Sequence, residues 1–316
     1  MRNLRIVFMG TPDFAVAILK KMLEEKLVVV GVITVPDKPA GRGRKLQESA
    51  VKKFAVTKEI PVLQPTNLKD EEFIKELKDL NANLHVVVAF RMLPKVVWDM
   101  PSYGTFNLHA SLLPNYRGAA PINWALINGE TKTGVTTFFI DEKIDTGEII
   151  LQKEVSIDNS MNAGELHDLL MYTGAELVID TIRAIEKGTV KTRKQPGTDV
   201  HKAAPKLFKD NCKIDWKNSA ENVHNKIRGL SPYPAAWSWL VNEETKEEKV
   251  KIFRSQPEKS SHTLEPGQLI IEKHSLKVAV KDGYIHILEM QLPGKRKMNI
   301  KDVLNGYSFD NNARMR

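Results

Sequence analysis

The sequence contains almost no cysteine. Among 316 residues, Cys212 is the single one. One thiol excludes an internal disulfide and any zinc site built from several cysteines. Proteins that use no disulfides are typical of reducing compartments, so we expect a cytoplasmic location. Cys212 lies in the segment KDNCKIDW, far along the chain from the candidate catalytic residues described below. We interpret it as a structural residue.

Long hydrophobic runs are lacking as well. Hydrophobic residues make up 42% of the chain, which is enough for buried cores. No apolar stretch reaches the roughly 20 residues that a membrane-spanning helix needs. The N-terminus, MRNLRIVFMG, leads into a strand-like run and a turn without the small-residue cleavage site of a signal peptide. We therefore expect no membrane segment and no signal peptide.

Nucleotide and metal motifs are also missing. The first predicted strand, at residues 4–9, ends in the turn GTPDF, which is not the G-x-G-x-x-G fingerprint of dinucleotide sites. The basic segment PDKPAGRGRKL, at residues 36–46, lacks the Gly-Lys-Ser/Thr ending of a P-loop. Its prolines and glycines predict neither helix nor strand. His, Asp and Glu do not cluster at ligand spacing, so the sequence predicts no metal.

Acidic residues are scarce in the C-terminal part. Residues 1–190 hold 23 Lys/Arg and 24 Asp/Glu, whereas residues 191–316 hold 24 and 15. The excess positive charge, a net +9, therefore lies in the C-terminal part. Such an imbalance favours a polyanionic partner, most simply nucleic acid. A solvated basic surface would give the same composition.

The order of the predicted elements indicates an α/β protein of two domains. A strand at 4–9, a helix at 14–25 and a strand at 28–35 form a β-α-β unit, which implies a parallel sheet. Residues 161–187 predict one or two helices. Beyond residue 207, several short alternating segments predict a small barrel or sandwich. We place a first domain at 1–189, a polar linker at 190–206 and a second domain at 207–316.

The candidate site begins in the stretch TFNLHASLLPNYRGAAP, at residues 105–121. Its alternation predicts a strand that carries Asn107 and His109 on one face. An amide can donate to a developing oxyanion, and an imidazole can move a proton near neutral pH. The N-x-H spacing by itself favours a simpler interpretation, namely two polar residues satisfied at the rim of a core.

A second stretch, GVTTFFIDEKIDTG at residues 134–147, strengthens the catalytic interpretation. It predicts a strand followed by a charged turn that contains Asp145. A carboxylate on such a loop can orient a histidine and stabilise its protonated form. Together, Asn107, His109 and Asp145 predict an acyl-transfer site. An ordinary turn aspartate is the alternative at residue 145.

These motifs, in this order, resemble the folate-dependent formyltransferases. The opening IVFMGTPDFA and the loop PDKPAGRGRKL are similar to the members that formylate initiator methionyl-tRNA. The resemblance runs from residue 4 to about residue 240 and continues more weakly beyond. It implies a Rossmann-like parallel-sheet formyltransferase domain that does not use nicotinamide. It also implies an OB-like C-terminal β-barrel that holds tRNA.

The resemblance implies formyl transfer from 10-formyltetrahydrofolate to the α-amine of initiator methionyl-tRNA. Asn107 would donate to the oxyanion, and His109 would polarise the formyl carbonyl or shuttle a proton. Asp145 would orient His109 and help to take the proton from the amine. The folate would contact the run Ser111, Leu112, Leu113 and Pro114.

The resemblance also implies contacts with the tRNA acceptor arm in the loop at 36–46. Arg42 matches the key arginine of that loop, and Arg44 and Lys45 add positive charge beside it. The loop by itself would be interpreted as flexible and solvated. One segment, Phe90–Pro94, departs from the family, which has a Tyr-Gly pair and one more residue there. Because that segment lines the folate pocket in relatives, the departure affects the expected shape of the pocket.

Three other functions stay open at this point. A formyltransferase for a small amine, such as a nucleotide or an amino sugar, would share Asn107, His109 and Asp145. So would a formyl-folate hydrolase, but neither needs the basic loop or the basic C-terminal part. A non-enzymatic tRNA-binding protein would need no such triad. The resemblance implies no obligate protein partner.

Overall fold

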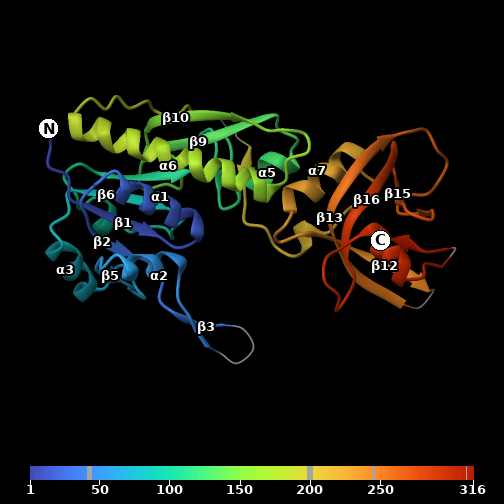
Figure 1. Cartoon of the computed structure of the whole chain (residues 1–316). Coiled ribbons are helices and arrows are strands. Elements are labelled where there is room, and N and C mark those ends of the chain that lie inside the picture. The colour runs from blue at the N-terminus through green and yellow to red at the C-terminus, as the bar shows by residue number, and fades with distance from the viewer. Residues whose placement is uncertain (41–44, 198–201, 244–245, 311) are drawn as a thin grey trace. The chain divides into compact units, whose positions relative to one another are not determined.

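The computed structural model describes residues 1–40, 45–197, 202–243, 246–310 and 312–316. The chain forms two compact units (Figure 1). The first comprises Met1–Gly118, Thr133–Ser156 and His167–Ala203, and the second Ala119–Lys132, Ile157–Leu166 and Ala204–Arg316. Each unit contains segments from several parts of the chain, so neither unit corresponds to one continuous stretch. The domain boundaries at 189 and 207 therefore stay predictions. Among the described residues, no helix is both long and apolar enough to cross a membrane.

The first unit is built on a seven-stranded sheet with the strand order β10-β9-β7-β6-β1-β2-β5. The five strands from β7 to β5 are parallel, and β9 runs antiparallel to β7. Buried runs such as IVFMG and LHVVV form its centre, as expected for strands covered on both faces. The predicted Rossmann-like sheet is therefore confirmed. The strands are β1 (Ile6–Gly10), β2 (Val29–Ile33), β5 (Val62–Leu63), β6 (Leu84–Val88), β7 (Thr105–His109), β9 (Lys132–Phe139) and β10 (Ile149–Ser156).

The helices of this unit are α1 (Asp13–Glu24), α2 (Ala50–Thr57), α3 (Glu71–Asp79), α4 (Lys95–Trp98) and most of α6 (Ala163–Lys187). α2 and α3 begin at side-chain caps, because Ser49 and Asp70 accept hydrogen bonds from backbone N–H groups three residues on. α6 is one continuous helix of 25 residues, where one or two helices were expected.

Two different layers cover the two faces of the sheet. On one face α6 approaches β7 closely at Gly174, where a Cβ would lie 2.8 Å from Cδ2 of Leu108. The opposite face carries a core in which Val87 packs with residues of α3 and α4. Val87 pairs with Asn107 in register, and paired residues share a face. Asn107 and His109 therefore point away from α6, on one face of β7 as predicted.

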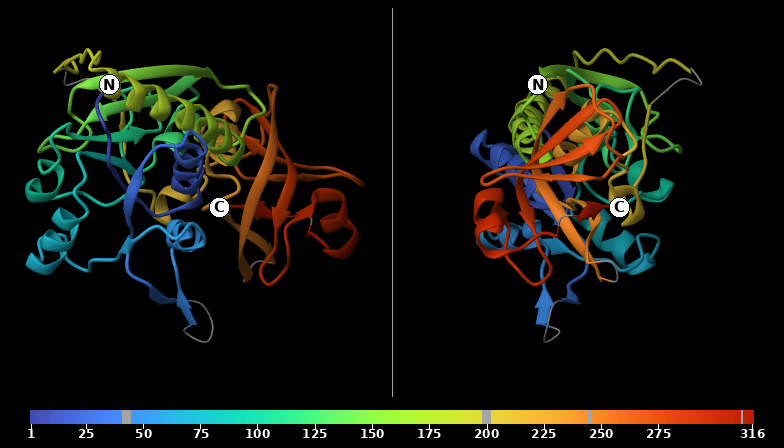
Figure 2. Two further views of the ribbon diagram at one scale, coloured as in Figure 1. Left: turned by 60° about the vertical axis from the view of Figure 1, so that its left-hand side comes forward. Right: turned by 90° about the vertical axis from the view of Figure 1, so that its right-hand side faces the viewer.

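The prediction of neither helix nor strand at residues 36–46 is wrong for the described ends of that segment. β3 (Lys38–Ala40) and β4 (Lys45–Gln47) pair in antiparallel fashion. They extend away from the main sheet (Figure 2). Pro39 is accommodated because a two-stranded ribbon consists of edge strands, which tolerate a missing N–H.

The second unit contains an antiparallel sheet in the order β14-β15-β16-β13-β12-β18, with β17 added to β16. The backbone closes it, because Gln268 bridges Arg314 and Met315 N donates to Gly267 O at 2.8 Å. The small barrel predicted for the C-terminal part is confirmed as this nearly closed sheet (Figure 2). Its strands are β12 (Ala236–Glu243), β13 (Lys246–Lys259), β14 (Leu269–Ile271), β15 (Leu276–Val280), β16 (Gly283–Gln291), β17 (Met298–Asn299) and β18 (Arg314–Met315).

Of the α-helices that the structure describes, those wholly within this unit are α5 (Pro121–Ile127), α7 (Ala220–Leu230) and α8 (Ile300–Gly306). α5 belongs here although it precedes β9 in sequence. It is tied to α7, because Asn123 Nδ2 donates to Gly229 O at 2.8 Å. The chain passes from the first unit to the second for the last time at β11 (Ala203–Ala204), which is followed by a 3-10 turn at Asp210–Cys212.

Candidate active site

The candidate site lies at the carboxyl edge of the parallel strands in the first unit. β1, β6 and β7 end there at Gly10, Val88 and His109. Loops that follow such strands share one edge of a sheet, where α/β proteins bind their ligands. The segment after β7 starts at this edge. Because β9 runs antiparallel to β7, the loop between β9 and β10 leaves β9 beside the amino end of β7, where Ile140 N donates to Thr105 O, and it reaches His109 through Asp145.

His109 is held by the backbone. Its side chain is buried, with 6% exposure, and its Nε2 lies 2.8 Å from the carbonyl oxygen of Tyr116. A carbonyl only accepts hydrogen bonds, so Nε2 must carry a proton. In the neutral imidazole, Nδ1 is therefore the nitrogen with a free lone pair. That nitrogen lies 3.7 Å from Oδ2 of Asp145.

Asp145 is held by the segment that follows β7. Its Oδ2 accepts a hydrogen bond from the backbone N–H of Gly118, in the two-residue strand β8 (Arg117–Gly118), at 2.9 Å. The carboxylate thus faces the imidazole nitrogen that can take up a proton. The structure brings His109 and Asp145 together, and their catalytic roles stay predictions.

Asn107 lies two residues before His109 on the same face of β7. Its side chain is partly exposed, and its amide makes no hydrogen bond to any residue that the structure describes. The amide N–H is therefore available to an oxygen placed beside His109. An oxyanion-stabilising role for Asn107 stays a prediction.

The run Ser111–Pro114 is fixed mainly through its backbone. Thr136 Oγ1 donates to Ser111 O at 2.6 Å and lies 3.2 Å from Leu113 N, which donates to it. Gln152 Nε2 donates to Leu113 O at 2.9 Å. The side chains of Ser111 and Leu113 are buried, whereas Leu112 and Pro114 are half-buried. The run is thus rigidly placed beside the site, and its contact with folate stays a prediction.

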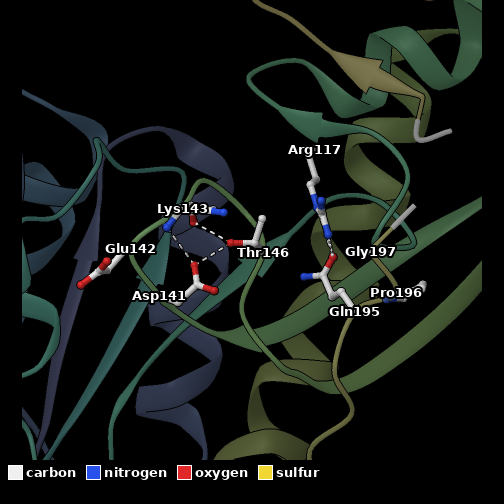
Figure 3. Close-up of a pocket in the computed structure, with 8 residues that line it drawn as sticks. All are labelled: Arg117, Asp141, Glu142, Lys143, Thr146, Gln195, Pro196 and Gly197. Atoms are coloured by element: carbon white, nitrogen blue, oxygen red, sulfur yellow. Dashed lines mark hydrogen bonds between the residues drawn. The ribbon is translucent and has the colours of Figure 1, made fainter. Parts of the chain in front are cut away.

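A pocket of about 660 Å³ adjoins the loop that carries Asp145. Figure 3 shows Arg117 and Gln195 pointing toward each other on one side of it, and Thr146 hydrogen-bonded to Asp141 on the other. Its lining residues are Arg117, Asp141, Glu142, Lys143, Thr146, Gln195, Pro196 and Gly197. Arg117 belongs to the motif YRGAAP, which was a signal for it in the sequence. Gln195 had none, since its segment was interpreted as a linker.

The described part of that segment is bound to the first unit. Ile149 and Arg193 exchange two backbone hydrogen bonds of 2.8 and 2.9 Å. Further along, Tyr116 N donates to Lys202 O at 2.5 Å. The polar segment after α6 therefore runs beside the residues that hold His109 and Asp145.

The predicted tRNA contacts can be placed only in part. Arg42 and Arg44 lie outside the described residues, and Lys45 begins β4 without a described side chain. In the segment that departs from the family, the guanidinium of Arg91 donates to the carbonyls of Thr66, at 3.0 Å, and of Pro65. Burial lowers the pKa of this guanidinium.

Two further titratable groups are buried away from the site. His85, in β6, is 1% exposed, and neither ring nitrogen has a hydrogen-bond partner among the described residues. Burial lowers its pKa to about 4. The nearby backbone of Val97 opposes this shift, although it makes no hydrogen bond to the His85 ring. Burial likewise raises the pKa of the Cys212 thiol, which lies in the core of the second unit. Among the described residues, no group of His, Cys, Asp and Glu could hold a metal ion.

Comparison with known proteins gives a consistent picture. A family model described as "Formyl transferase" matches residues 4–182, and one described as "Formyl transferase, C-terminal domain" matches residues 206–308. A methionyl-tRNA formyltransferase from Flavobacterium johnsoniae is 58% identical over 315 residues, which cover 100% of both chains. One from Bacteroides fragilis is 53% identical and covers 99% of this chain and 98% of its own.

Similar solved structures are more distant in sequence. HypX from Aquifex aeolicus in complex with tetrahydrofolic acid has a TM-score of 0.64 at 19% identity, covering 96% of this chain and 47% of its own. WlaRD, a sugar 3N-formyl transferase, has a TM-score of 0.64 at 23% identity, covering 94% of this chain and 100% of its own. At these identities the likeness establishes the fold and nothing further.

Proposed function

This chain belongs to the formyltransferase family, and we propose that it formylates initiator methionyl-tRNA for translation initiation. The formyl donor is 10-formyltetrahydrofolate, and the acceptor is the α-amine of the methionyl group. One observation carries the chemistry: His109 has Nε2 bonded to a backbone carbonyl and Nδ1 facing Asp145. The name of relatives more than 50% identical over the whole chain supports the choice of acceptor.

The reaction requires one proton to move as two bonds change. The amine attacks the formyl carbon, which forms a C–N bond and a tetrahedral oxyanion. Asn107 donates a hydrogen bond to that oxyanion. His109 takes the amine proton on Nδ1 and returns it to the folate nitrogen when the original C–N bond breaks. The charge of Asp145 stabilises the imidazolium in between.

Of the two roles expected for His109, the geometry supports proton shuttling. Nε2 already donates to Tyr116 O at 2.8 Å, so it is not free to polarise the formyl carbonyl. Nδ1 is the nitrogen that can gain a proton. Because Tyr116 O is a backbone atom that can only accept, this assignment does not depend on the side chain at residue 116.

The two substrates are assigned to different parts of the chain. The folate contacts the run Ser111, Leu112, Leu113 and Pro114, at the edge of the sheet beside His109. The tRNA contacts Arg42, Arg44 and Lys45 and the second unit. The net charge of +9 in residues 191–316 supports a polyanionic partner. A cytoplasmic location fits both substrates.

The test is transfer of labelled formyl from 10-formyltetrahydrofolate to initiator methionyl-tRNA, with elongator methionyl-tRNA and free methionine in parallel. Transfer to the initiator alone is the expected result. Folate turnover without transfer to any tRNA would contradict the proposal and favour a small amine or water as the acceptor.

The catalytic assignment is tested by His109→Ala. We expect kcat to fall by about 10²- to 10⁴-fold, the range contributed by a positioned general base. Binding of initiator methionyl-tRNA, measured by filter retention, should be unchanged because the side chain of His109 is buried. Equal losses of binding and of kcat would contradict the assigned role.

A further inference from the structure

Among the described residues, one side chain distant in sequence holds the backbone of the loop that carries Asp145. Gln195 Nε2 donates to the carbonyl oxygens of Asp145 and Gly147, at 2.9 and 2.8 Å. Gln195 lies 50 residues beyond Asp145 in sequence. The carboxylate of Asp145 is held separately, by Gly118 N. Asp145 is therefore fixed at both its backbone and its side chain.

The orientation of the Gln195 amide is determined by its partners. Its Oε1 accepts two hydrogen bonds from Arg117, from Nη2 at 2.6 Å and from Nε at 3.2 Å (Figure 3). A guanidinium can only donate, and the two loop carbonyls can only accept. If the amide oxygen and nitrogen of Gln195 exchanged places, both bonds from Arg117 and both bonds to the loop carbonyls would be lost. Since Arg117 precedes Gly118, the contacts close a ring from Asp145 through Gln195 and Arg117 back to Asp145.

The loop adopts a conformation that needs external support. Asp145 has φ of 55°, in the left-handed region that costs a non-glycine residue free energy. Gly147 approaches β9 so closely that a Cβ there would lie 1.7 Å from Phe139 O. Without Gln195, two carbonyl groups would lose their donors, and little would oppose relaxation of Asp145 to a more favourable φ.

We propose that Gln195 is a positioning residue for formyl transfer: it holds Asp145 so that its carboxylate faces Nδ1 of His109. Gln195 acts through Asp145 and does not touch the reacting atoms. The proposal rests on the proposed function and extends its site to the polar segment after α6. That segment thus contributes to catalysis in addition to joining the two units along the chain.

The test uses two substitutions of different chemistry. Gln195→Met removes the hydrogen bonds at similar length. Gln195→Glu keeps the acceptor for Arg117 but places a negative oxygen against two carbonyls, so it should displace the loop further. A displacement of about 1 Å would lower kcat by roughly 10²-fold, with the Glu variant slower than the Met variant. The matched control is Thr192→Val, in the same segment, which removes only the hydrogen bond to the half-buried Glu148 side chain. It should keep wild-type kcat.

A double-mutant cycle with Asp145→Ala separates positioning from general structural damage. If Gln195 acts through Asp145, Gln195→Glu should lower kcat strongly in the wild-type background and less than about 2-fold in the Asp145→Ala background. An equal reduction in both backgrounds, or none in the wild type, would overturn the proposal. If Gln195→Glu does not fold, Gln195→Met takes its place in the cycle. A wild-type chain that transfers no formyl to tRNA would instead overturn the proposed function.

Discussion

His85 makes the stability of the first unit sensitive to acid. It is buried in β6, and its pKa lies at about 4 in the folded chain, against 6.5 for the free side chain. Above about pH 6.5 the residue is neutral in both states and has no effect. As the pH falls from there to about 4, the unfolded chain binds a proton that the folded chain does not. The shift of about 2.5 units then lowers the free energy of unfolding by about 3 kcal/mol.

His85→Leu should remove this acid sensitivity, because leucine does not titrate. The assay is urea unfolding of wild type and variant near pH 7 and near pH 4, followed by circular dichroism. The variant should gain about 3 kcal/mol relative to wild type at the lower pH. Val86→Ala, a neighbouring buried position without charge, is the control and should cost the same at both pH values. A difference between wild type and His85→Leu that does not change with pH would refute the reasoning.

Two glycine substitutions test the close backbone approaches. Gly147→Ala should lower kcat by roughly 10²-fold, because its Cβ would clash with Phe139 O and move the Asp145 loop; wild-type kcat would contradict the assigned role of this loop. Gly267→Ala should lower the free energy of unfolding by about 1–3 kcal/mol, because its φ is +91° and its Cβ would lie 2.2 Å from Met315 O. Thermal unfolding measures this loss, and an unchanged melting temperature would show that the barrel closure tolerates a Cβ.

Much of the fold follows from local patterns in the sequence. The apolar run at β1 is uninterrupted, so it predicted a strand of the parallel sheet that the structure contains. The helix α5 could not be assigned to the second unit in this way, because its partner α7 lies about a hundred residues further along the chain. A contact between two segments so far apart in sequence leaves no pattern of apolar residues in either segment that would identify its partner.

In the candidate site, too, features that depend on the local sequence were predictable, and features that depend on distant contacts were not. Asn107 and His109 were predicted to lie together because side chains alternate between the two faces of a strand. In the structure both residues lie on the same face of β7. The tautomer of His109 was not predictable, since it depends on a carbonyl seven residues away that only the turn after β7 brings near. Gln195 was missed for a related reason: a glutamine in a polar segment resembles a solvated residue until its two acceptors are known.

The geometry assigns separate tasks to the two partners of His109 in the proposed mechanism. The backbone at Tyr116 fixes which nitrogen is protonated, whereas Asp145, at 3.7 Å, is beyond ordinary hydrogen-bond distance and acts through its charge. An electrostatic interaction between the two groups depends on the distance between them. This interaction weakens as the loop moves away, whereas the tautomer does not change. The rate should therefore depend on what holds the loop, and among the described residues that is chiefly Gln195 and Gly118.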